Sequence, residues 1–356
     1  MMNKNCFKIL VGVVLGLFLL GSPIYASENL IKNGGFEQGK EYFNFPKKGV
    51  EVVLEKPHSG KRCLRIQEGG FGRKGFVEIK PDTTYTCSFW YRTDKTSLSS
   101  SEQSFTPKQT FQFQTVIYNS VGRKIIENWR TFFYPSTQWR QVKTYFYSRD
   151  NTKVFIHFSP CIPSGNLHID DLTFFPTTDD EFKDNLIVNG EFEEEFPYHW
   201  SASRAWRPKG IPVPPVPAYF LDKESGFQMG KQSLRMDCKE KDGFSLKSQY
   251  FPVRNEEIYT YSLWMKSDVK GFPVRVMFYT LPKKGRKHFH KVLKIELGLN
   301  WEKYDFEVNI PDINHGYYEK ACIQLSAPHS YSGNWDPQTP AGSLWIDKVE
   351  VYEVEE

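Results

Sequence analysis

Six short blocks of this sequence occur twice, in the same order along the chain. In the first pair, NLIKNGGFEQG and NLIVNGEFEEE, seven of eleven positions are identical. The six pairs are Asn29–Gly39 with Asn185–Glu195, Ser59–Ile66 with Met229–Met236, Tyr85–Asp94 with Tyr259–Asp268, Gln138–Phe146 with Asn300–Val308, Phe155–Pro160 with Cys322–Ala327, and Gly165–Phe175 with Gly342–Tyr352. This order indicates a tandem duplication of a unit of roughly 150 residues, a usual domain size.

The blocks alternate in the manner of half-buried strands. Within 111–118, Phe111, Phe113, Thr115 and Ile117 face one way and the residues between them face the other. Residues 274–279 repeat this pattern, and no long segment has a helical period. Short strands separated by Gly, Pro, Asn and Asp predict an all-β chain of two tandem antiparallel β-sandwiches.

The first 26 residues have the pattern of a secretory signal peptide. Lys4 and Lys8 precede an apolar run, Ile9–Leu20, and Ala26 is an acceptable cleavage position. An uncleaved N-terminal anchor is the alternative. We therefore expect a signal peptide over 1–26, a first sandwich over 27–178 and a second over 185–356. The polar segment Thr177–Asp184 joins the two. Either reading predicts an exported protein, which is secreted, periplasmic or at the cell surface.

Charge and cysteine usage exclude several classes of function. Removal of Lys4 and Lys8 lowers the 46 Lys and Arg residues to 44 against 42 acids, a net charge of +2. A nucleic-acid partner usually requires a clear basic excess, so none is expected. The cysteines of the mature chain have no metal-ligand spacing, and we expect mostly buried thiols with at most one or two disulfides. They are Cys63, Cys87, Cys161, Cys238 and Cys322.

The repeated blocks resemble a known family. An opening NxGFE phrase, a GKxxLR strand, a YxxSxWxxxD strand and a closing IDD-type strand together resemble carbohydrate-binding modules of families 4, 9 and 22. These belong to the galactose-binding-domain-like group of jelly-roll sandwiches. The resemblance covers Asn29–Pro176 and Asn185–Glu356. It fits better in the second copy, where Trp200 stands at the position of a buried Trp.

The resemblance also implies a structural calcium site where the first and last strands meet. Calcium prefers several hard oxygen ligands, both carboxylates and backbone carbonyls. The implied ligands are Glu37, Asp170 and the carbonyl of Lys61 in the first copy, and Glu193, Asp347 and the carbonyl of Lys231 in the second. The alternative is that Glu37 and Glu193 are surface acids beside a glycine turn.

Sugar binding requires flat aromatic faces next to polar groups, and the concave face of one sheet is the usual cleft in modules of this type. In the two copies, Trp139 and Trp301 recur and are expected in the core, while Trp90 and Trp264 are open between core and ligand. The polar candidates could equally be the solvated face of a sheet. The candidates are Arg275, Tyr279, Gln324, Trp264 and Lys266 in the second copy, Gln112, Gln114, Tyr118, His157, Trp90 and Arg92 in the first, and Trp129, Trp206 and Trp335 in loops.

No catalytic arrangement stands out. The acids cluster in turns instead of forming an opposed pair, and no nucleophile elbow, HExxH or phosphate loop occurs. The basic run Lys283–Lys291 is either a solvated turn or a contact for an anionic polysaccharide. The sequence thus predicts a monomeric, non-catalytic carbohydrate-binding protein. The alternatives are a structural or adhesive surface protein that binds a protein partner, and an accessory component of a carbohydrate-active hydrolase.

Overall fold

The computed structural model describes residues 28–46, 48–94, 111–119, 125–133, 135–161, 165–178, 182, 184–194, 199–204, 218–238, 244–282, 288–311, 318–327 and 340–354. The expected signal peptide, Trp206, Trp335 and residues 283–287 of the basic run lie outside these ranges. The described residues form 22 strands in four antiparallel sheets, so the predicted all-β class is confirmed. Within them, no helix is both long and apolar enough to cross a membrane.

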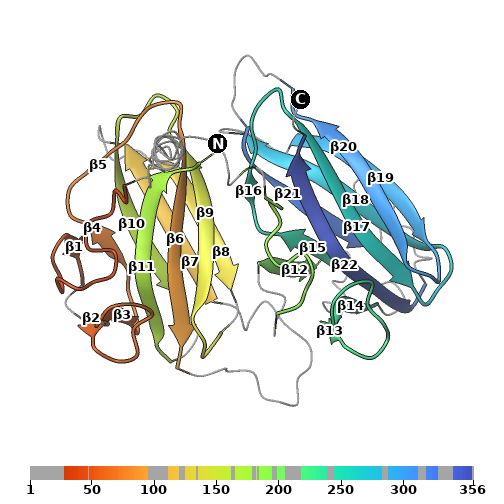
Figure 1. Cartoon of the computed structure of the whole chain (residues 1–356), viewed down its shortest axis with the longest axis horizontal. Coiled ribbons are helices and arrows are strands. Elements are labelled where there is room, and N and C mark those ends of the chain that lie inside the picture. Colours follow the sequence, from red (N-terminus) through yellow and green to blue (C-terminus); the bar gives the residue numbers. More distant parts are fainter. Residues whose placement is uncertain are drawn as a thin grey trace, which may run out of the picture.

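The first half of the chain forms two sheets that face each other as a sandwich (Figure 1). One has the order β1-β4-β10-β7-β8, with β5 also paired to β10, and the other has the order β2-β3-β11-β6-β9. The bounds are β1 Phe43–Asn44, β2 Val50–Val53, β3 Cys63–Ile66, β4 Phe71–Arg73, β5 Val77–Glu78, β6 Thr84–Thr93, β7 Phe111–Asn119, β8 Ile125–Phe133, β9 Arg140–Tyr147, β10 Lys153–Cys161 and β11 Leu167–Pro176.

The second half repeats this strand order. Its sheets are β12-β15-β21-β18-β19, with β16 paired to β21, and β13-β14-β22-β17-β20. The bounds are β12 Trp200–Arg204, β13 Ala218–Asp222, β14 Ser233–Cys238, β15 Phe244–Ser248, β16 Phe251–Pro252, β17 Ile258–Ser267, β18 Phe272–Pro282, β19 His288–Leu297, β20 Glu302–Asn309, β21 Tyr318–Ala327 and β22 Gly342–Glu353. Two halves with one strand order are what a duplicated sandwich requires.

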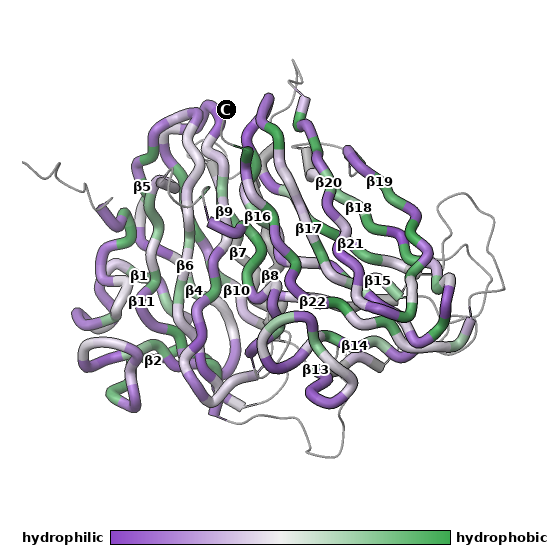
Figure 2. The backbone as a smooth tube through the Cα atoms, turned by 45° about the vertical axis from the view of Figure 1, so that its right-hand side comes forward, coloured by the Kyte–Doolittle hydropathy of each residue, from purple (hydrophilic) through white to green (hydrophobic). Residues whose placement is uncertain are grey.

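Alternation along the strands fills the core of each sandwich. Val154, Ile156 and Phe158 of β10 are fully buried, while the residues between them are half-buried. Figure 2 shows hydrophilic and hydrophobic residues alternating along β19 and β20. The expected buried Trp200 packs against Phe192 at 5.2 Å between ring centroids and is 2% exposed.

The repeated NxGxF phrase begins each sandwich because its glycine lies against the last strand. A Cβ atom at Gly34 would stand 1.9 Å from the carbonyl oxygen of Leu172, and one at Gly190 would stand 2.0 Å from that of Val349. Only glycine permits such an approach of two backbones. The phenylalanine of the phrase, Phe36 in the first copy and Phe192 in the second, is fully buried in the core. The phrase thus packs the start of each sandwich against its last strand.

Two smaller expectations concern cysteines and the tether. Cys63, Cys87, Cys238 and Cys322 are buried free thiols, as predicted, and the side chain of Cys161 lies outside the described residues. In the tether, Phe182 is buried and the guanidinium of Arg254 lies 4.0 Å from its ring centroid. This contact fastens the tether to the second sandwich.

Candidate functional site

The carboxylates implied as calcium ligands meet the glycine turn of the GK motif in the first sandwich. Glu37 Oε1 accepts hydrogen bonds from the backbone N–H groups of Lys61 (2.7 Å) and Arg62 (2.9 Å). Asp170 Oδ2 accepts those of His58 (2.8 Å) and Ser59 (3.2 Å). Both acids therefore hold the turn between β2 and β3 against the end of the sheet.

The second sandwich repeats this arrangement. Glu193 Oε1 accepts the backbone N–H of Lys231 at 2.7 Å, and Asp347 Oδ2 accepts those of Gln228 (2.8 Å) and Met229 (3.0 Å). Recurrence of the same bonds in both copies shows that Glu37 and Glu193 are fixed parts of the fold.

Two of these acids, Asp170 and Asp347, are buried and form no ion pair among the described residues, so their negative charge would suit a hard cation. Asp170 and Asp347 are both 0% exposed. Burial and, less strongly, the nearby charge of Asp171 raise the pKa of Asp170 to about 6, although its backbone hydrogen bonds act to lower it. Burial also raises the pKa of Asp347. A bound cation would offset that cost. Within the described ranges no three His, Cys, Asp or Glu residues form a metal-binding group, so the remaining ligands would have to be carbonyls such as those of Lys61 and Lys231.

Three of the predicted ligand residues of the second sandwich share one sheet face. β18 and β21 pair Arg275 with Ser326, Met277 with Gln324 and Tyr279 with Cys322, which places Arg275, Tyr279 and Gln324 on the outer side of the sheet. This face is closed: Tyr279 is 0%, Gln324 6% and Arg275 8% exposed. Gln324 Nε2 donates to Ser245 Oγ at 2.9 Å. These residues lie together as predicted, yet they expose little side-chain surface to a ligand.

The corresponding face of the first sandwich is more open. Tyr118 of β7 pairs with Phe155 of β10 in the sheet, and their half-exposed rings lie 6.2 Å apart. His157 comes next on this face and packs over Gly72, where a Cβ would lie 3.2 Å from its Nδ1. Burial lowers the pKa of His157, so the ring is neutral at pH 7. Gln112 and Gln114 have the matching backbone register, but their side chains lie outside the described residues. The expectation that Trp129 lies in a loop is wrong, because it belongs to β8, and its side chain is also outside the described residues.

Trp90 and Trp264 belong to the opposite sheet of each sandwich, in β6 and β17, so they share a strand face with the candidates Arg92 and Lys266 and not with the other polar candidates. Trp90 stacks on His58 with ring centroids 3.9 Å apart. The expectation that Trp139 and Trp301 belong to the core is wrong, because both are half-buried.

Trp139 and Trp301 each lie beside a cationic side chain. The guanidinium of Arg92 lies 5.5 Å from the ring centroid of Trp139, and the ammonium of Lys266 lies 5.2 Å from that of Trp301. Cation–aromatic contacts of this kind stabilise partly exposed rings.

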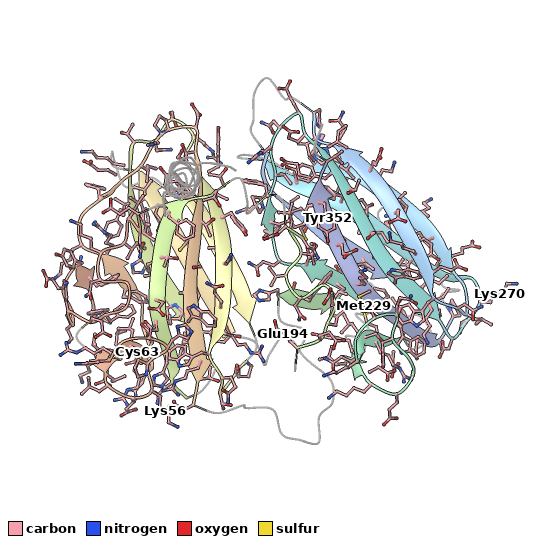
Figure 3. The ribbon with its side chains drawn as sticks, viewed as in Figure 1. Lys56, Cys63, Glu194, Met229, Lys270 and Tyr352 are labelled. Carbon is pink, nitrogen blue, oxygen red and sulfur yellow. The ribbon has the colours of Figure 1, made fainter. Side chains whose placement is uncertain are left out.

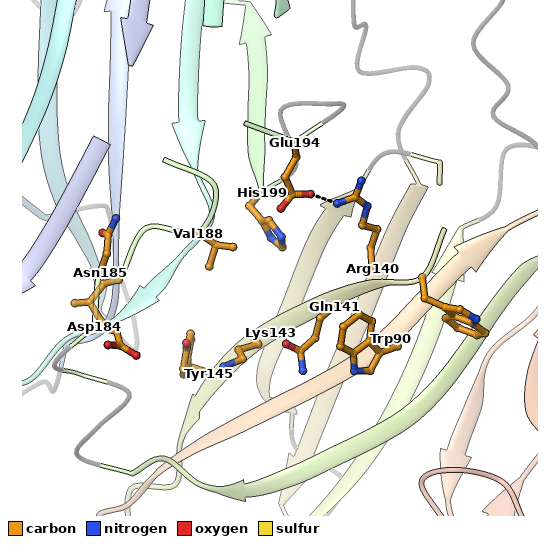
Figure 4. Close-up of a pocket in the computed structure, with 12 residues that line it drawn as sticks. Trp90, Arg140, Gln141, Lys143, Tyr145, Asp184, Asn185, Val188, Glu194 and His199 are labelled. Atoms are coloured by element: carbon orange, nitrogen blue, oxygen red, sulfur yellow. Dashed lines mark hydrogen bonds and ion pairs between the residues drawn. The ribbon is translucent and has the colours of Figure 1, made fainter. Parts of the chain in front are cut away.

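A cavity lies where the two sandwiches meet (Figure 4). Its volume is about 430 Å³, within the range of small-ligand sites. The floor is the outer face of β6 and β9, and the opposite wall is the start of the second sandwich. The floor residues are Trp90, Trp139, Gln141, Lys143 and Tyr145, and the wall residues include Asp184, Val188, Glu194 and His199.

Polar contacts close one side of this cavity. Arg140 forms an ion pair with Glu194, which lies between the sandwiches in Figure 3. Gln249 donates to the carbonyl of Lys143 and also contacts His199. Burial lowers the pKa of His199 to about 4, so this imidazole is neutral at pH 7.

Comparison with known proteins gives a family for the first sandwich. Residues 28–161 match the family model for modules of families 4 and 9, described as a carbohydrate binding domain. The first sandwich matches a carbohydrate-binding module. This finding confirms the predicted resemblance over these residues. No curated protein matches the chain.

Several solved structures are similar to this chain. The tandem CBM22-1 and CBM22-2 domains of Paenibacillus barcinonensis Xyn10C share 12% identity with a TM-score of 0.31, covering 94% of this chain and 100% of that one. A structure titled "CBM4 structure and function" shares 17% identity with a TM-score of 0.34, over 47% of this chain and 99% of that one. A Stig cyclase from Fischerella sp. TAU shares 12% identity with a TM-score of 0.36, over 48% and 98%.

Sequence reasoning did not find the cavity between the sandwiches. Gln141, Lys143 and Tyr145 lie in a recurring block, but at positions where the copies differ: the second copy has Lys303, Asp305 and Glu307. That divergence on one strand face is the only signal in the sequence. Whether the outer face of this strand lines a cavity depends on how the two sandwiches pack against each other. No local sequence pattern predicts that packing.

Proposed function

We propose that this protein is an exported, non-catalytic carbohydrate-binding protein with two tandem jelly-roll modules. The match of residues 28–161 to the carbohydrate binding domain carries the proposal. The half-exposed pair Tyr118 and Phe155, with neutral His157 beside it, supports the first module as the main ligand surface. Flat apolar rings next to a polar group are the setting that sugar rings require.

The ligand surface can be tested by affinity gel electrophoresis on xylan, mixed-linkage glucan, galactan and polygalacturonate. We expect the wild-type chain to be retarded by at least one of them and Tyr118→Ala to weaken that binding about tenfold, because a stacking ring is lost. Lys153→Ala, an exposed residue of β10 paired with Glu78 at 3.2 Å, should bind as the wild type does. Retention on polygalacturonate alone would favour the anionic ligand suggested by the basic run.

Failure of the folded chain to bind any of these polysaccharides would contradict the proposal and favour the adhesive alternative. Release of reducing sugar from a bound polysaccharide would contradict the non-catalytic part. Export is tested separately by sequencing the N-terminus of protein recovered outside the cytoplasm. The monomeric state is tested by measuring the mass of the protein in solution.

We also propose that each module holds a structural calcium ion through Glu37 and Asp170, or Glu193 and Asp347. The carbonyls of Lys61 and Lys231 would complete the sets. Support comes from the buried carboxylates of Asp170 and Asp347, which form no ion pair among the described residues, and from the recurrence of the Glu37 and Glu193 hydrogen bonds in both copies. When bound, calcium would supply positive charge that lets these acids ionise inside the fold.

Calcium should raise the melting temperature of the wild-type chain, and chelation should lower it. Asp170→Asn is expected to abolish the calcium-dependent shift of the first sandwich, and Asp347→Asn that of the second, because each removes a buried negative charge. Differential scanning calorimetry with and without chelator measures this, and elemental analysis gives the metal content. Melting that is indifferent to calcium, together with metal-free protein, would contradict the proposal.

A further inference from the structure

The cavity between the sandwiches has the components of a sugar-binding site that is separate from the open face of Tyr118. Along the floor, Gln141, Lys143 and Tyr145 alternate on β9 and point into the cavity (Figure 4). Residues two apart on a strand are about 6.8 Å apart, so these three span about 14 Å. The floor is therefore long enough for a short oligosaccharide.

The aromatic end of this floor is held rigid. Trp90 lies opposite Gln141 in the β6–β9 pair, and one face of its indole is covered by His58. His58 is itself tied to Asp171 Oδ2 by a contact of 2.6 Å. A ring braced in this way can receive a sugar on its remaining side without losing further side-chain freedom.

Gln141 provides a polar group next to that ring. Its amide is half-buried and makes no side-chain hydrogen bond within the described part of the chain. An amide carries both donors and an acceptor, which suits the paired donor and acceptor character of a sugar hydroxyl. The other walls do not satisfy this group, so a ligand could.

The charges that line the cavity balance. Arg140 and Lys143 are cationic, Asp184 and Glu194 are anionic, and the imidazole of His199 is neutral at pH 7. A cavity without net charge does not select a polyanion or a polycation. Together with the indole face, this balance favours a neutral polar ligand.

The same surface of the second sandwich differs. A cavity of about 430 Å³ there is lined by Asp305, Glu307 and Glu350 with Lys303 as the only cationic lining residue, so acids stand where the first sandwich has Lys143 and Tyr145. In addition, the wall of the junction cavity comes from residues beyond the first sandwich, among them Asp184, Val188, Glu194 and His199. The junction site thus exists only because the two sandwiches stand in tandem.

We propose that the junction cavity binds a short neutral oligosaccharide, with a sugar ring on the free face of Trp90 and a hydroxyl on the amide of Gln141. The ligand class rests on the proposed function. Because floor and wall come from different sandwiches, the bound sugar also fixes one sandwich against the other.

Isothermal titration of the full-length chain with xylotriose, cellotriose and β-1,4-galactotriose tests this site. We expect at least one trisaccharide to bind, Gln141→Ala to weaken that binding about fivefold through one lost hydrogen bond, and Trp90→Ala to weaken it tenfold or more. Circular dichroism checks the fold of Trp90→Ala, and Gln141→Ala serves alone if that variant does not fold. Lys303→Ala, the equivalent of Gln141 in the second sandwich, should change nothing.

The variants separate this site from the open face. Loss with Gln141→Ala and Trp90→Ala, but not with Tyr118→Ala, supports the junction site. Loss with Tyr118→Ala alone overturns the junction site and leaves the proposed function standing. Retention on polysaccharide gels without trisaccharide binding also overturns it. If neither trisaccharides nor polysaccharides bind, both proposals fall.

Discussion

Gly34→Ala is expected to destabilise the first sandwich by about 3 kcal/mol or more. The added Cβ would stand 1.9 Å from the carbonyl oxygen of Leu172 in β11. That oxygen is part of the backbone of a central strand and cannot swing away as a side chain would. The backbone N–H of Leu172 also donates to the carbonyl of Gly34 at 3.0 Å, so separation of the two segments would break this bond.

Urea denaturation followed by fluorescence measures this loss, and the adjacent glycine is a matched control. A Cβ at Gly35 would lie 3.5 Å from a side-chain oxygen of Asp171, an ordinary contact, so Gly35→Ala should stay within about 0.5 kcal/mol of the wild type. Gly190→Ala should destabilise the second sandwich in the same way as Gly34→Ala does the first. An unchanged transition in Gly34→Ala would show that the close approach is not what requires glycine.

The repeated NxGxF phrase shows how much the sequence could predict. Recurrence alone marked the start of each sandwich, and the structure places it there. The reason for the glycine was not accessible, because the backbone that excludes a side chain belongs to Leu172 at the other end of the sandwich. A long-range contact of this kind restricts which residue type can occupy the position, but it produces no pattern in the neighbouring sequence.

Strand parity predicted faces correctly but not sheets. Alternation placed Arg275 and Tyr279 opposite Val274, Val276 and Phe278, and the register agrees. Parity cannot tell which of two sheets a strand joins. β6 and β7 follow each other in sequence yet belong to opposite sheets, which separates Trp90 from Tyr118.

Exposure was the least predictable property of the candidate site. The family pattern was expected to fit better in the second sandwich, which has Trp200, but the family model matches residues 28–161 of the first. Tyr279 and Gln324 of the second sandwich are buried, whereas Tyr118 of the first is half-exposed. Likewise, Trp139 and Trp301 recur in both copies without being in the core. A recurring aromatic residue therefore shows that a position is constrained, not whether the constraint is packing or a cation beside the ring.

Asp222→Ala is expected to destabilise the second sandwich by about 3 kcal/mol. Asp222 is 5% exposed and accepts hydrogen bonds from Trp345 Nε1 (2.7 Å) and from the backbone N–H groups of Glu224 (2.8 Å) and Ser225 (2.9 Å). Arg235 Nη1 lies 3.6 Å from the same carboxylate. Removal of this acceptor leaves the buried indole N–H of Trp345 unsatisfied, which costs more than the bond contributes.

The same carboxylate gives the second sandwich a pH dependence with a defined sign. Although burial acts to raise it, the hydrogen bonds from Ser225 and Trp345 hold the pKa of Asp222 well below its usual range. The folded state therefore favours the ionised form of Asp222. The stability that this carboxylate contributes is present above about pH 4, the pKa of an Asp in an unfolded chain, and is lost as the pH falls below that value.

Denaturation of wild type and Asp222→Ala at pH 7 and pH 3 should give free energies of unfolding that differ less at the lower pH. Asp305→Ala, an exposed acid paired with Lys303 at 2.8 Å, is the control and should cost less than about 1 kcal/mol at either pH. A difference between wild type and Asp222→Ala that is constant from pH 7 to pH 3 would mean that the ionised carboxylate is not what holds Trp345 in place.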